Sequence, residues 1–104
     1  MTTNESHAQY LLDDGEYYVR LDPECRAAQD MASVVLEWRS LVSTPERIGS
    51  VQLQADQSWL ARVAAPEDDF PSGFEIVATS ESRLDAIVAL WQHRHGAFLG
   101  RHAL

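Results

Sequence analysis

Residues 22–42, DPECRAAQDMASVVLEWRSLV, decide the fold, because two different elements fit them. With a period of three to four residues, the apolar positions form one face of an amphipathic helix: Ala28, Met31, Val35, Trp38, and Leu41 or Val42. Asp22 suits the N-cap of that helix and Pro23 its first position. The run Ser33-Val34-Val35-Leu36 suits a strand instead. The capping residues and the longer period favour the helix, so the sequence predicts a helix over 23–42.

A hairpin is indicated before this stretch. Tyr10-Leu11-Leu12 and residues 16–21 are rich in β-favouring side chains, and they flank Asp13-Asp14-Gly15. Asp-Gly is a strong hairpin-turn dipeptide between two such runs. We therefore expect a short hairpin here, or at least one strand at 16–21.

Three more strands are predicted after residue 45, at 47–54, 58–65 and 73–78, because apolar and polar residues alternate there. In the third strand, Phe74, Ile76 and Ala78 point one way, and we expect that side to face the core. A helix then follows over 80–95, capped by Thr79 or Ser80 and ended by Gly96 in a left-handed conformation. Its apolar face comprises Leu84, Ile87, Val88, Trp91 and His95.

These elements predict an α+β fold: an antiparallel three- to four-stranded sheet with two helices on one face. The core order is α-β-β-β-α, preceded by the short strand or hairpin. In 104 residues with 45% apolar content, we expect one domain at 9–104 and a disordered N-terminus at 1–8. The order of elements resembles the double-stranded RNA-binding fold. That fold carries basic residues at the start of its last helix, where this chain has only Arg83 beside Glu81.

The charge balance narrows the choice of partners. Sixteen acidic residues face eight basic ones, giving a net charge of −8, and every basic residue is an arginine. Such a charge repels nucleic-acid phosphates and anionic lipid, so we expect neither nucleic-acid nor membrane binding. Residues 1–7 lack the pattern of a secretory signal, and a single cysteine fits a reducing compartment. We therefore expect a cytoplasmic protein.

Three groups of residues contain side chains that could carry out chemistry. His93 and His95, with His102 nearby, lie two apart on a helix and so point to opposite sides, which argues against a metal site. Cys25 has no partner motif and fits a buried or half-buried structural thiol. Glu67-Asp68-Asp69 and Asp56 lack the spacing of a calcium loop. The sequence thus indicates no catalytic, cofactor-binding or metal-binding residue, and no cofactor.

The hypothesis that remains is a non-catalytic protein-interaction domain whose protein partner is unknown. Two alternatives stay open: an acidic inhibitor, immunity-type or nucleic-acid-mimic protein, and a small enzyme without a recognisable motif. We also expect a homodimer, because two helices cover only one face of a small sheet. The opposite face is predicted to carry Ser50, Gln52, Gln54, Leu60, Arg62, Ala64, Glu75 and Val77.

Overall fold

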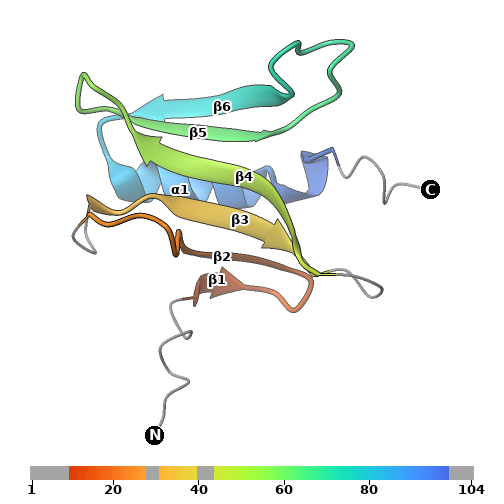
Figure 1. Cartoon of the computed structure of the whole chain (residues 1–104). Coiled ribbons are helices and arrows are strands. Elements are labelled where there is room, and N and C mark those ends of the chain that lie inside the picture. The colour runs from red at the N-terminus through yellow and green to blue at the C-terminus, as the bar shows by residue number, and fades with distance from the viewer. Residues whose placement is uncertain (1–9, 28–30, 40–43, 99–104) are drawn as a thin grey trace, which may run out of the picture.

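The computed structural model describes residues 10–27, 31–39 and 44–98. It shows one six-stranded antiparallel sheet with a single α-helix against one face (Figure 1). The strands lie in the sheet in chain order, from β1 at one edge to β6 at the other. The elements are β1 (Tyr10–Asp13), β2 (Tyr17–Leu21), β3 (Val34–Trp38), β4 (Glu46–Leu53), β5 (Trp59–Ala64), β6 (Phe74–Ser80), the helix α1 (Arg83–Gln92) and the 3-10 turn η3 (Arg94–Gly96).

The expected α-β-β-β-α fold with two helices is therefore wrong. The sheet has six strands where three or four were predicted, and the described part of residues 23–42 contains no α-helix. The predicted strands themselves are confirmed by β2, β4, β5 and β6, and the N-terminal hairpin by β1 and β2. The predicted disordered segment 1–8 lies outside the described residues.

The strand β3 replaces the predicted first helix. Val34, Val35 and Leu36 are consecutive and each at most 1% exposed. An amphipathic helix buries one stripe and cannot bury three residues in a row against one sheet, whereas a central strand covered on both faces can. Asp22 does accept a hydrogen bond from the Glu24 backbone N–H at 2.9 Å, but the turn it stabilises does not continue as a helix.

A β-bulge in β6 overturns the predicted orientation of that strand. Ala61 pairs with Ala78, but the next residue, Arg62, pairs with Ile76, so Val77 is inserted between them. One extra residue moves all side chains beyond it to the other face. Ala78 therefore faces the helix as predicted, whereas Ile76 lies on the face that no helix covers.

The last helix is shorter than the predicted 80–95. Ser82 is the N-cap, and its side chain accepts a hydrogen bond from the Asp85 backbone N–H at 3.1 Å. The C-cap is His93, with φ −99°, so Gly96 does not provide the expected left-handed cap. The ten-residue helix packs its buried side, centred on Ala86 and Leu90, onto strands β3 to β6. Among the described residues, no helix is long and apolar enough to cross a membrane.

The core lies between α1 and the sheet. Leu36, Ile48 and Val51 are fully buried there, together with Leu90 of the helix. Gly49 lies where β4 passes beneath α1: a Cβ at this position would stand 2.9 Å from a Leu90 methyl carbon and 2.9 Å from a backbone carbonyl oxygen of β5. Glycine is thus the residue that allows helix and sheet to approach closely here.

Candidate functional site

The face of the sheet opposite α1 carries a row of paired residues. Arg20, Val35, Ser50, Arg62 and Ile76 are neighbours in register across β2 to β6. Most positions on either side of this row, such as Leu36, Val51 and Val63, belong to the core under the helix, so alternation places the row on the helix-free face. This face is not simply a solvated surface, because two members of the row, Val35 and Ser50, are 1% and 7% exposed.

A buried carboxylate organises one end of this face. Glu37 of β3 is 6% exposed and accepts a hydrogen bond from the Tyr18 hydroxyl at 2.6 Å. Its two oxygens also accept from Arg20 Nε at 3.0 Å and Nη2 at 3.2 Å. Burial, followed by the bond to Glu37, raises the pKa of Tyr18 above its ordinary value. The cluster is therefore a satisfied polar network that holds Arg20 across the sheet.

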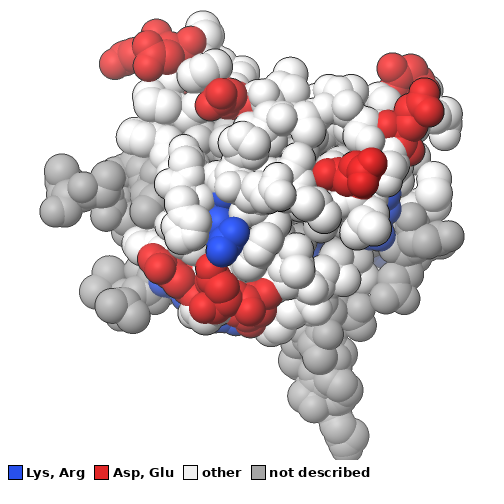
Figure 2. Space-filling model, turned by 180° about the vertical axis from the view of Figure 1, so that it is seen from behind, with Lys and Arg blue, Asp and Glu red and all other residues white. Residues whose placement is uncertain are grey.

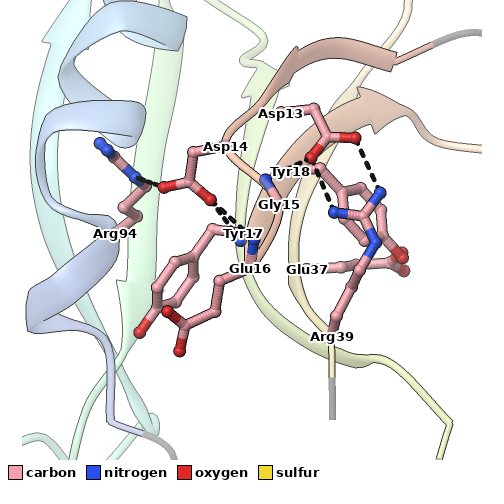
Figure 3. Close-up of polar contacts among 9 residues, drawn as sticks. All are labelled: Asp13, Asp14, Gly15, Glu16, Tyr17, Tyr18, Glu37, Arg39 and Arg94. Atoms are coloured by element: carbon pink, nitrogen blue, oxygen red, sulfur yellow. Dashed lines mark hydrogen bonds and ion pairs between the residues drawn. The ribbon is translucent and has the colours of Figure 1, made fainter. Parts of the chain in front are cut away.

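Arg39 extends the network to the first hairpin, as Figure 3 shows. Its guanidinium lies 4.3 Å from the centre of the Tyr18 ring and donates two hydrogen bonds, both of 2.7 Å, to Asp13. These bonds, with one from the Gly15 N–H, hold the pKa of Asp13 below its ordinary value. The turn itself requires Gly15, whose φ is +96°.

Asp14, which lies between Asp13 and Gly15 in the turn, links the hairpin to the segment that follows the helix (Figure 3). It accepts hydrogen bonds from the backbone N–H of Tyr17 at 2.7 Å and from Arg94 Nε at 2.9 Å. The bond from Tyr17 is the main cause that lowers the pKa of Asp14 to about 2. Arg94 is in turn held 4.0 Å from the Trp91 ring. The first hairpin is thus held on one side to η3, the turn that follows α1, and on the other side to β3.

A cavity of about 240 Å³ opens on the helix-free face. Its polar lining comes from Arg47, Ser50 and Gln52 of β4, from Arg62 of β5 and from Asp22, which follows β2. Phe74 of β6 forms an apolar wall, with the Arg62 guanidinium 4.4 Å from its ring centre. The cavity is smaller than the roughly 300–1,000 Å³ of typical small-molecule sites, which fits a single functional group better than a whole cofactor.

The strand β6, which contributes Phe74 to this cavity, forms one edge of the sheet (Figure 1). Within the described ranges, no strand pairs with its outer side. Phe74 is 36% exposed and Ile76 is 62% exposed, and neither lysine nor proline interrupts the strand. Proteins usually protect a long edge strand with such residues, because its unpaired backbone groups readily bind another chain. The protective features that β6 does contain are the Val77 bulge and the charged side chain of Glu75.

The histidines and the cysteine singled out from the sequence are not brought together. His93 lies at the end of α1 with its Nδ1 2.9 Å from the Ala89 carbonyl, and His95 packs edge-on to Tyr17 at 5.0 Å. Tyr17 is the first residue of β2, whereas Cys25 follows the last residue of that strand and is half-buried. Backbone hydrogen bonds, that of Ser33 first, lower the pKa of the Cys25 thiol. His102 lies outside the described residues.

The acidic groups are also separated. Asp56 lies in the turn between β4 and β5, where it accepts hydrogen bonds from Ser58, whereas Glu67-Asp68-Asp69 lie in the loop at the other end of β5. Figure 2 shows the acidic side chains of the helix side in several separate groups, with much uncharged surface between them. Among the residues that the structure describes, no three His, Cys, Asp or Glu side chains are placed to hold a metal ion.

The residues that line the cavity were not recognised as a site from the sequence. Arg47, Arg62 and Phe74 belong to three different strands, and only the pairing register brings them together. The alternation did place Ser50 and Arg62 correctly on the face away from the core. For Ile76 no such signal exists, because the bulge reverses the alternation at Val77.

The comparisons with known proteins add no family to this description. The chain matches no family model, no curated protein and no solved structure. The features from which we infer a function are the helix-free face, its cavity and the free edge of β6.

Proposed function

We propose that this chain is a non-catalytic protein-interaction domain of the cytoplasm, and that it binds an extended segment of a partner protein along β6. The observation that carries the proposal is the exposure of Phe74 and Ile76 on an edge strand. A segment that added to this edge would form main-chain hydrogen bonds with β6, and its alternate side chains would contact the helix-free face. Ile76 would then be covered by the added strand.

Two other observations support an interaction surface in preference to the alternatives. The cavity beside β6 has the size of a side-chain pocket, and Cys25 and His95 lie at opposite ends of β2, which gives an enzyme no shared centre. A nucleic-acid mimic needs its carboxylates in one continuous array. On the face seen in Figure 2 they form separate groups.

Site-specific photo-crosslinking tests the proposal. A photoreactive phenylalanine replaces Ile76 in one sample and Leu84 in a matched control, since Leu84 is equally apolar and 68% exposed but lies on α1. We expect a defined adduct from position 76 in cells of the native host, and none from position 84. Mass spectrometry then identifies the crosslinked segment of the partner.

The identified segment is next synthesised and titrated into the purified protein. It should bind the wild type and bind Ile76→Asp at least tenfold more weakly, because a negative charge then replaces the apolar side chain where the segment packs. An adduct of twice the 11.7 kDa chain mass would identify the partner as a second copy, as expected for the homodimer. Equal capture at both positions, or unchanged binding to Ile76→Asp, would contradict the proposal.

A further inference from the structure

The charges around the cavity do not balance. Glu37 is paired with Arg20 at 3.0 Å, and Asp22 lies 3.9 Å from Arg47, which is itself 4.0 Å from Glu37. Three guanidinium groups, counting Arg62, thus surround two carboxylates. The local charge is +1 in a protein whose net charge is −8.

Of these three arginines, Arg62 is the one without an acidic partner among the described residues. Within the described part of the chain it forms no ion pair, and its one hydrogen bond runs from Nε to the Ser50 hydroxyl at 3.4 Å. The guanidinium plane is held beside the Phe74 ring, with 4.4 Å between its central carbon and the ring centre. An arginine has five N–H donors, so most of its donors stay available to a ligand in the cavity. The ring and Ser50 hold the group in place before any ligand binds.

We propose that the cavity between Arg47 and Arg62 binds a carboxylate, contributed by an acidic residue of the segment that lies along β6. The inference rests on the proposed function for the source of the carboxylate. A carboxylate carries the single negative charge that the cluster lacks, and its two oxygens match the planar fork of a guanidinium. A phosphate monoester carries about −1.5 to −2 charges and would overcompensate the site in an acidic protein.

The register supports an acidic side chain from that segment. Arg62 is paired with Ile76, so both side chains lie on the helix-free face on neighbouring strands. A strand added to β6 would lie about 4.8 Å further out and would direct every second side chain to the same face. A glutamate opposite Ile76 would then extend over it toward Arg62, while the apolar Phe74 ring limits access of water to the ion pair.

Titration of acetate into isotope-labelled protein tests the pocket itself. The probes are the ¹⁵N resonance of Arg62 Nε and, in every variant, the backbone amide resonances of the residues that line the cavity, followed by NMR at constant ionic strength with chloride as the balancing anion. We expect a saturable shift at Arg62 and a binding constant at least tenfold weaker in Arg62→Gln. Arg47→Gln should also weaken binding, and circular dichroism verifies that both variants fold. The matched control is Arg94→Gln, because Arg94 also packs against an aromatic ring, that of Trp91, but lies on the helix side.

Two tripeptides distinguish the sources of the carboxylate. Acetyl-Gly-Glu-Gly-amide offers a side-chain carboxylate, and acetyl-Gly-Gly-Gly offers only a terminal one. We expect the first to shift Arg62 at lower concentration. Non-saturable shifts that are equal at Arg62 and Arg94, unchanged binding to Arg62→Gln, or tighter binding of phosphate than of acetate would overturn the carboxylate site.

The photo-crosslinking result separates this inference from the proposed function. Partner capture at position 76 without acetate binding would refute the carboxylate pocket alone. Acetate binding without capture at position 76 would refute the role of β6, and with it the partner as the source of the carboxylate.

Discussion

Replacement of Glu37 by glutamine removes the one buried negative charge from the polar network of Tyr18, Arg20 and Glu37 and hardly changes the shape of the side chain. The carboxylate accepts three hydrogen bonds, two of them from Arg20, and its side chain is 8% exposed. Hydrogen bonds to charged groups each contribute about 1.5–3 kcal/mol to stability. Arg20 is 31% exposed and can regain water, so the two bonds are not lost at full value. We expect Glu37→Gln to lower the free energy of unfolding by about 2 kcal/mol.

Urea unfolding followed by circular dichroism measures this loss, and a thermal scan should show the midpoint lowered by about 8–15 °C. Glu24→Gln is the matched control, because Glu24 is exposed and the same change there should stay within about 0.5 kcal/mol. Tyr18→Phe, combined with Glu37→Gln in a double-mutant cycle, measures the coupling between the two side chains. If Glu37→Gln unfolds like the Glu24→Gln control, the network does not stabilise the sheet and the reasoning fails.

Three more results are expected. Gly49→Ala should cost about 1–3 kcal/mol in urea unfolding, because its Cβ would contact the helix and a β5 carbonyl at 2.9 Å, whereas Gly96→Ala, with no atom within 4 Å of the new Cβ, should be neutral. The pKa of Asp14, about 2 against an ordinary 3.8, contributes stability above pH 4 that is lost as the pH falls toward 2. In Asp14→Asn the loss of stability over this pH range should be smaller by about 1 kcal/mol. Equal losses in the wild type and the variant would contradict this. At the alkaline end the raised pKa of Tyr18 means that the unfolded chain releases a proton which the folded chain retains, so stability should fall above about pH 10, and less so in Tyr18→Phe.

The sequence predicts the strands well because their signals are local. The Asp-Gly turn and the alternation around Val51 and Trp59 are decided by neighbours in the chain, and β4 and β5 lie where they were expected. The helix predicted over 23–42 is wrong although its signals are also local. The structure of this segment is decided by contacts with strands that are distant in the sequence. Val35 is buried in a strand that pairs with β2 on one side and β4 on the other. The capping residues of the segment contain no information about that pairing.

The candidate site was beyond prediction for a related reason. A site made by Arg47, Arg62 and Phe74 exists only once β4, β5 and β6 pair in one register, and the bulge at Val77 decides on which face Ile76 lies. Bulges depend on the partner strand as much as on the strand that contains them. Sequence alternation alone therefore places a side chain correctly only up to the nearest bulge.

The order of the strands has a consequence for how fast the chain folds and unfolds. Every pairing in the sheet joins segments that follow each other in the chain, so each strand can add to the previous one at a modest cost in loop-closure entropy. The ion pair between Asp14 and Arg94 is different, because it joins residues 80 positions apart. We expect it to close only after α1 has docked on the sheet, because its two residues come from the first hairpin and from the turn that follows α1. A contact made after the rate-limiting barrier slows unfolding without speeding folding, so we expect this ion pair to lengthen the lifetime of the folded state.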